Sequence, residues 1–103
     1  MQIDDYVEWA RKAEQVEVTA EVSDVQLAIM GLSLLGDAGE VADMLKRRLR
    51  DGVLDRERLA NELGDVLYYW ARICAVTGVT PSTLLDQSRR NIEPRLARRA
   101  QAS

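Results

Sequence analysis

Apolar residues recur at three- and four-residue spacing through most of this chain, which is the period of an amphipathic α-helix. The pattern predicts four helices joined by short segments that contain polar residues or glycine. The first helix covers roughly residues 2–17, with Ile3, Tyr6, Val7 and Ala10 at helical spacing. The chain is therefore predicted to be all-α.

Capping residues mark the ends of the next two helices. Ser23-Asp24 offers an N-cap for a long second helix that runs to about Arg50. It stops at Asp51-Gly52, because glycine readily takes the left-handed conformation that ends helices. The third helix starts near Asp55 and ends at Thr77-Gly78 for the same reason.

The fourth helix opens at Thr80-Pro81, with threonine as the cap and proline at the first helical position, where a missing N–H costs nothing. It continues into the 90s. Because Pro94 falls inside this pattern, we expect a kink or an end near Glu93.

Two acids interrupt the apolar stripes of the long helices. Asp37 falls in the stripe of the second helix, and Glu62 lies at the edge of the stripe of the third. The carboxylates are thus predicted to face inward, where each needs a counter-charge or a proton. The stripes are Leu27, Met30, Leu34, Val41 and Leu45 on the second helix, and Leu59, Leu63, Val66, Trp70 and Ile73 on the third.

Apolar residues also lie off these stripes, for example Ile29, Leu32 and Leu35 on the second helix and Leu67 on the third. A helix that is apolar on more than one face needs more than one neighbour. We therefore predict a single domain, residues 1–103, in which an antiparallel helical hairpin forms a four-helix bundle core completed by dimerisation. A homotetramer built from such dimers is an equal alternative.

Charge and composition narrow the class of protein. The net charge of −3 argues against DNA or RNA as the main partner, although residues 89–103 contain five arginines and one acidic residue. Cys74 is the single cysteine and is predicted to be a buried, inert thiol. The N-terminus lacks the basic and apolar segments of a signal peptide, and we expect no apolar run of transmembrane length, so a soluble cytoplasmic protein without a membrane partner is predicted.

The candidate chemistry lies in two short motifs, Asp37-Ala-Gly-Glu40 and Glu62-Leu-Gly-Asp65. Acids three residues apart project from one side of a helix. The chain contains no histidine, so a hard cation that prefers oxygen ligands, Mg²⁺ or alternatively Mn²⁺, is the natural partner of such a group. Spacing alone leaves open that these are surface acids paired with arginine or lysine, since Glu40-Val-Ala-Asp43 has the same spacing.

Residues 35–43 and 61–69, which contain the two motifs, resemble the MazG-like all-α nucleoside triphosphate pyrophosphohydrolases, whose usual pattern is ExxE, a spacer and ExxD. The resemblance extends from about Gln26 to Arg99. It implies that Asp37, Glu40, Glu62 and Asp65 bind Mg²⁺ and that a metal-activated water attacks the α-phosphorus of a (deoxy)nucleoside triphosphate. The products would be pyrophosphate and the monophosphate, as in nucleotide-pool housecleaning. Glu40 is the first candidate for the acid that accepts the proton of the water.

The same resemblance implies substrate contacts. Lys46 would meet phosphate oxygens, Tyr69 would pack on the sugar and disfavour a 2′-hydroxyl, and Asn91 would reach the nucleotide. Read from their residue types alone, these three would be a solvated lysine, a core tyrosine and a surface asparagine.

The sequence departs from the family pattern at two places. Asp37 stands where glutamate is usual, which shortens that ligand by one methylene, and Pro94 stands where a phosphate-binding lysine is usual. Arg95 or Arg98 could replace the lysine. Two alternatives therefore stay open: a phosphoribosyl-ATP pyrophosphohydrolase, or a helical module that binds a nucleotide or a partner without catalysis.

Overall fold

The structure is a computed structural model that describes residues 1–14 and 22–102. These residues form α1 (Ile3–Ala13), α2 (Asp24–Asp51), α3 (Arg56–Thr77) and α4 (Pro81–Ala102), and they contain no strand. The prediction of an all-α chain is confirmed.

The predicted caps explain most of the helix ends. The Ser23 hydroxyl accepts a hydrogen bond from the Gln26 amide at 3.1 Å, and the Asp55 carboxylate accepts one from the Arg58 amide at 3.1 Å. Gly52 and Gly78 end α2 and α3 with φ of 75° each, in the left-handed region that a side chain would disfavour.

Two helix ends differ from the prediction. α1 ends at Ala13, and Glu14 already has a non-helical ψ of 1°. The prediction that the first helix includes Glu14 is therefore wrong, while residues 15–17 of the predicted helix lie outside the described residues. α4 continues through Pro94 to Ala102, so an end near Glu93 is also wrong. Pro94 has no N–H to donate to the backbone carbonyl of Arg90, but Arg90 is exposed, so water can donate to this carbonyl instead.

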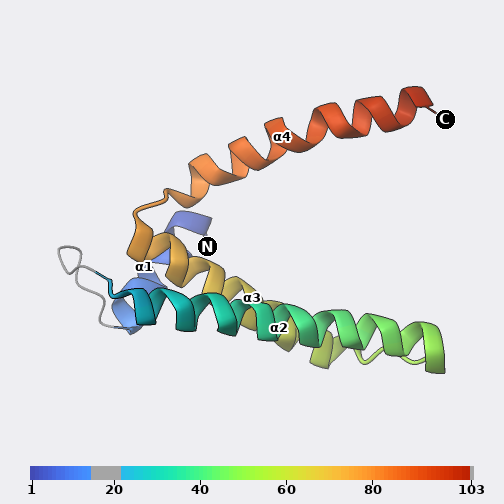
Figure 1. Ribbon diagram of the computed structural model, residues 1–103, viewed down its shortest axis with the longest axis horizontal. Coiled ribbons are helices and arrows are strands. Elements are labelled where there is room, and N and C mark those ends of the chain that lie inside the picture. Colours follow the sequence, from blue (N-terminus) through green and yellow to red (C-terminus); the bar gives the residue numbers. More distant parts are fainter. Residues whose placement is uncertain (15–21, 103) are drawn as a thin grey trace.

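The helices form a hairpin with two additions. α2 and α3 lie side by side and antiparallel, α1 packs across the end of α3, and α4 extends away from the hairpin after the turn at Gly78 (Figure 1). The main tertiary contact of α4 is with α1. The hairpin agrees with the prediction, whereas one chain alone does not build a four-helix bundle, so the bundle and its completion by a second copy stay predictions.

The core of the chain is small. Val7 and Ala10 of α1 pack against Ala71 and Cys74 of α3, while Met30 and Met44 are the buried residues of α2. The predicted stripes are only partly covered: Met30 is buried, but Leu27, Leu45 and Leu63 remain 41%, 50% and 49% exposed. The radius of gyration is 16.7 Å, against about 13 Å for a compact domain of this length.

α2 is long and apolar enough to cross a membrane, with a mean hydropathy of 1.3 over its most apolar 18-residue window. Length and composition alone define this criterion, and a helix that packs inside a soluble protein satisfies it too. By this criterion the expectation that no apolar run is long enough to span a membrane is wrong for α2, and the soluble, cytoplasmic location stays a prediction.

Candidate metal and nucleotide site

Three of the four predicted metal ligands come together. Asp37 of α2 and Glu62 and Asp65 of α3 each place a carboxylate oxygen within 4.8 Å of the others. The antiparallel hairpin causes this meeting, because it sets the middle of α2 beside the first half of α3. Asp37 and Glu62 are half-buried as predicted, and Asp65 is exposed.

These three side chains, which we call the acidic cluster, fit a hard divalent cation. All their donor atoms are oxygen, the ligand type that Mg²⁺ prefers, and in an octahedral Mg²⁺ shell neighbouring ligands are about 3 Å apart and opposite ligands about 4.2 Å. The three carboxylates, whose oxygens lie within 4.8 Å of one another, would have to draw closer by side-chain rotation to bind one ion. Without a cation each pair of charges repels by about 1 kcal/mol at the dielectric constant of water and more in a less polar setting.

Glu40 lies beside the acidic cluster and not in it. Its side chain is exposed, and so is that of Asp65. Three residues turn a helix by about 300°, which places Glu40 about 60° around α2 from Asp37 and away from the contact with α3. A metal-binding or proton-accepting role for Glu40 stays a prediction.

Tyr69 follows Asp65 by one helical turn and is half-buried. The Arg72 guanidinium lies 5.7 Å from the centre of the Tyr69 ring and 3.8 Å from Glu14, and its Nε is buried with no hydrogen-bond partner among residues 1–14 and 22–102. Sequence reasoning missed Arg72. The signal was available, because Asp65, Tyr69 and Arg72 are spaced by four and three residues and so share one side of α3.

Further aromatic residues continue from Tyr69 onto α1. The Tyr68 ring lies 5.7 Å from Tyr69 and 6.0 Å from Trp9, and Trp9 lies 5.5 Å from Tyr6. Trp9 is 50% exposed, and its ring covers part of the contact between α1 and α3. Burial raises the pKa of Tyr68 to about 12, helped by the hydrogen bond that its hydroxyl donates to Glu14.

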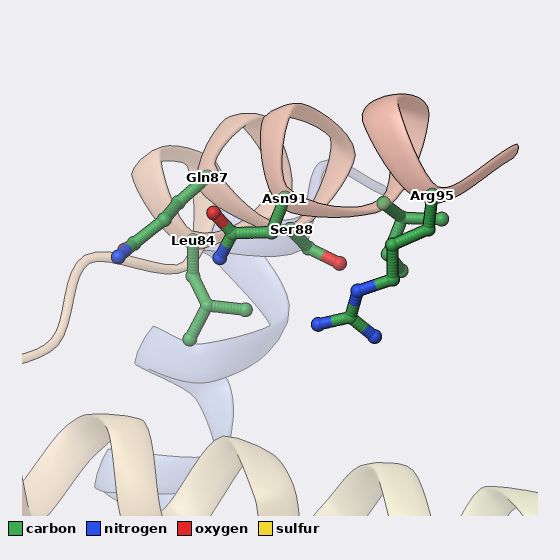
Figure 2. A pocket seen from close by; sticks show the side chains of 6 residues that line it. Leu84, Gln87, Ser88, Asn91 and Arg95 are labelled. Atoms are coloured by element: carbon green, nitrogen blue, oxygen red, sulfur yellow. The ribbon is translucent and has the colours of Figure 1, made fainter. Parts of the chain in front are cut away.

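The predicted substrate residues of α4 lie elsewhere. Figure 2 shows Asn91 and Arg95 reaching, with Leu84, Gln87 and Ser88, from α4 into the open space on the side where α3 lies. All residues lining this space belong to α4. Since α4 extends away from the hairpin, one chain does not bring Asn91, Arg95 or the exposed Arg98 to the acidic cluster.

Two other predicted residues lie on the hairpin. Lys46 is exposed on α2, nine residues after Asp37, which is about 13 Å along the helix axis. Cys74 is 3% exposed, which confirms the predicted burial, and burial raises the pKa of its thiol; the predicted low reactivity stays a prediction.

Comparisons with known proteins add little about activity. No family model matches the chain, and no solved structure matches it. The Gene 37 protein of Mycobacterium phage L5 is 35% identical over 74 residues, a match that covers 67% of this chain and 65% of the phage protein. The match thus spans slightly less than two thirds of that relative, whose name states no activity.

Proposed function

We propose that this protein is a Mg²⁺-dependent nucleoside triphosphate pyrophosphohydrolase of the MazG-like kind. The observation that carries the proposal is the acidic cluster, in which the two sequence motifs supply three carboxylates from two helices within 4.8 Å. Like charges at this distance repel one another and destabilise the fold. A bound cation would remove this repulsion, and this supports the proposal.

The chain's own residues have distinct tasks in this proposal. Asp37, Glu62 and Asp65 hold the cation, which when bound would neutralise phosphate charge, polarise phosphorus and make a bound water more acidic. Glu40, beside the cluster and open to solvent, accepts the proton of the attacking water. The water oxygen bonds to the α-phosphorus, the α–β anhydride bond breaks, and pyrophosphate leaves.

Tyr69 is proposed to select the sugar of the substrate. It stands one turn from Asp65 on the same side of α3, and the Arg72 guanidinium lies 5.7 Å from the centre of its ring. The resemblance implies that this ring packs on the sugar and disfavours a 2′-hydroxyl, so we propose a preference for deoxynucleotides. Lys46, exposed further along α2, is proposed to meet the phosphate tail.

The proposed enzyme is a homodimer. A single chain has a radius of gyration about a quarter larger than a compact domain of its length, and it leaves large apolar residues exposed on all of its long helices. Pairing of two copies would cover these residues and complete the predicted four-helix bundle.

Pyrophosphate release tests the proposal directly. The purified protein is incubated with a panel of ribo- and deoxynucleoside triphosphates and with phosphoribosyl-ATP, in Mg²⁺, in Mn²⁺ and in EDTA. We expect metal-dependent release of pyrophosphate and a monophosphate from deoxynucleotides, and none from Glu62→Gln. Release from phosphoribosyl-ATP alone would identify the related enzyme. Nucleotide binding without release from any substrate would overturn the proposal and leave a non-catalytic binding module.

A further inference from the structure

The ring of Tyr69 is held by two neighbours on its own helix. The Arg72 guanidinium lies over its face, 5.7 Å from the ring centre, and the Tyr68 ring stands against it at an interplanar angle of 71° and a centroid distance of 5.7 Å. Aromatic rings favour both contacts, because a cation is attracted to the ring face and a second ring to an edge-to-face arrangement. The orientation of Tyr69 therefore depends on where Tyr68 and Arg72 are placed.

Glu14, directly after α1, contacts both of these neighbours. Its carboxylate accepts a hydrogen bond from the Tyr68 hydroxyl and lies 3.8 Å from the Arg72 guanidinium. Tyr68 and Arg72 are one helical turn apart on α3, so a single carboxylate can reach both. Glu14, Tyr68, Tyr69 and Arg72 thus form a closed set of contacts, which we call the tyrosine clamp.

α1 gives Glu14 a fixed position. Val7 and Ala10 are the buried residues of this helix and pack against α3, and α1 lies across the end of α3 (Figure 1). The Glu14 amide donates a hydrogen bond to the Ala10 carbonyl at 3.1 Å. Because buried packing anchors the helix one turn before Glu14, the carboxylate can hold both neighbours of Tyr69 in place.

Arg72 is a costly residue for this position. Its side chain is only 24% exposed, and its Nε is buried with no hydrogen-bond partner in the described ranges 1–14 and 22–102. A buried donor without a partner lowers stability, and an unbranched apolar side chain would avoid this cost. Packing between α1 and α3 therefore does not explain an arginine here, whereas a positive charge over the Tyr69 ring does.

Arg72 also lies on the side of α3 that carries the candidate site. Asp65 belongs to the acidic cluster, and Tyr69 and Arg72 follow it at intervals of four and three residues. Arg72 is about 10 Å further along the helix axis than Asp65, with Tyr69 between them. Its charge therefore acts on the ring of Tyr69 and not on the cation position.

We propose that Arg72 is a positioning residue that sets the sugar preference of the site: held by Glu14, it fixes the Tyr69 ring on which the sugar packs. Arg72 itself does not touch the substrate. The tyrosine clamp stands on contacts within the folded chain, whereas its effect on sugar preference rests on the proposed function.

Aromatic ¹³C relaxation tests the tyrosine clamp without any activity. The NMR order parameter of the Tyr69 ring, assigned with Tyr69→Phe, is measured in wild type, Arg72→Met and Arg72→Lys. We expect a lower order parameter in Arg72→Met and a partial return in Arg72→Lys, which keeps the charge but loses the planar guanidinium. Circular dichroism checks that each variant stays helical. An order parameter that is unchanged in Arg72→Met would overturn the proposal.

Arg50→Met is the matched control for this measurement. It also removes an arginine from an ion pair, since Arg50 lies 3.0 Å from Asp51, but it does so in the last turn of α2. This position is about 20 Å along the helix axis from Asp37. The order parameter of Tyr69 should stay at the wild-type value in this variant, and a decrease equal to that in Arg72→Met would overturn the specific role of Arg72.

Sugar selectivity tests the effect of the tyrosine clamp on the reaction. For each variant, kcat/KM is measured with a deoxynucleoside triphosphate and with the matching ribonucleotide. Arg72→Met should narrow the ratio of the two values about two- to fivefold, which corresponds to one cation–π contact at a partly exposed site. Glu14→Gln keeps an acceptor for Tyr68 but loses the charge that faces Arg72, so it should narrow the ratio less. A general loss of structure would lower both values together, and an unchanged ratio would overturn the role of Arg72.

The double variant Tyr69→Ala/Arg72→Met separates positioning from direct contact. If Arg72 acts through the Tyr69 ring, its removal has no further effect once the ring is gone, so the double variant should show the ratio of Tyr69→Ala alone. Further narrowing would mean that Arg72 contacts the sugar itself and would overturn the positioning role. A wild type that releases no pyrophosphate from any nucleotide would refute the proposed function and the sugar preference with it, while the order parameter of Tyr69 would still decide whether the clamp exists.

Discussion

The acidic cluster makes an unusual prediction about stability: removing one of its charges should stabilise the metal-free protein. We choose Glu62→Gln, which keeps the shape of the side chain and removes one charge. Glu62 is half-buried between Asp37 and Asp65, with oxygens of all three residues within 4.8 Å. Most substitutions destabilise a protein, so a gain here would point to repulsion at this place.

The size of the gain follows from the distance. Two unit charges 4.8 Å apart repel by about 0.9 kcal/mol at the dielectric constant of water, and Glu62 has two such neighbours. Screening at physiological salt roughly halves this sum, to about 1 kcal/mol. For a domain of this length, 1 kcal/mol raises the melting temperature by about 4–8 °C. Added Mg²⁺ should make wild type more stable than Glu62→Gln, because a ligand at 100 times its dissociation constant raises the free energy of unfolding of the protein that binds it by about 2.7 kcal/mol.

Differential scanning calorimetry of wild type and variant, in EDTA and in Mg²⁺ at one protein concentration, measures both effects. Glu57→Gln is the matched control. It makes the same change in the first turn of α3, where an acid interacts favourably with the helix dipole, so it should cost about 0.3–1 kcal/mol. If Glu62→Gln melts below wild type in EDTA, or if Mg²⁺ raises both proteins equally, the acidic cluster is neither strained nor a cation site.

Three further predictions concern single side chains. Tyr69→Ala should narrow the ratio of deoxy- to ribonucleotide hydrolysis rates several-fold; an unchanged ratio would remove Tyr69 from sugar selection. The pKa of Tyr68 is about 12 in the folded protein against an ordinary value of 10.0, so its protonated hydroxyl stabilises the fold fully below pH 10, and this stabilisation falls as the pH rises toward 12. In Tyr68→Phe, the free energy of unfolding, measured by denaturant titration between pH 9 and about 12, should therefore decrease less with pH than in wild type; an equal decrease would contradict the role of Tyr68. Cys74, which is 3% exposed and has a raised pKa, should react with a thiol reagent only as fast as the chain opens, and reaction at the rate of a free thiol would contradict its burial.

The sequence predicts the helices well because their ends depend on local chemistry. Ser23, Asp55, Gly52 and Gly78 each act within a few residues of their own position, through a cap hydrogen bond or a left-handed turn. Pro94 shows the limit of such reasoning. Proline removes one backbone hydrogen bond of a helix. In α4, a helix of 22 residues that is exposed around Pro94, water can take the place of the missing donor, and the helix continues.

The sequence predicts the candidate site correctly only for residues whose position depends on the packing of α2 against α3 alone. Asp37, Glu62 and Asp65 meet because α2 and α3 are consecutive, antiparallel and joined by a short turn. Glu40 and the α4 residues could not be placed the same way. Glu40 lies about 60° around α2 from Asp37, so a small rotation of the helix decides whether its carboxylate faces the acidic cluster or solvent. The position of Arg95 depends on the angle between α4 and α1, which the Asp4–Ser82 hydrogen bonds help to set.

That angle decides whether Arg95 can serve the acidic cluster. If α4 packed on its own hairpin, Arg95 could reach the cluster of its own chain, and the apolar side of α2 would still be exposed. The Asp4–Ser82 hydrogen bonds instead anchor the first turn of α4 to α1, and α4 then extends away from the hairpin. In the proposed homodimer, the exposed apolar surface of α2 and the distance of Arg95 from the cluster would be two results of this one geometry.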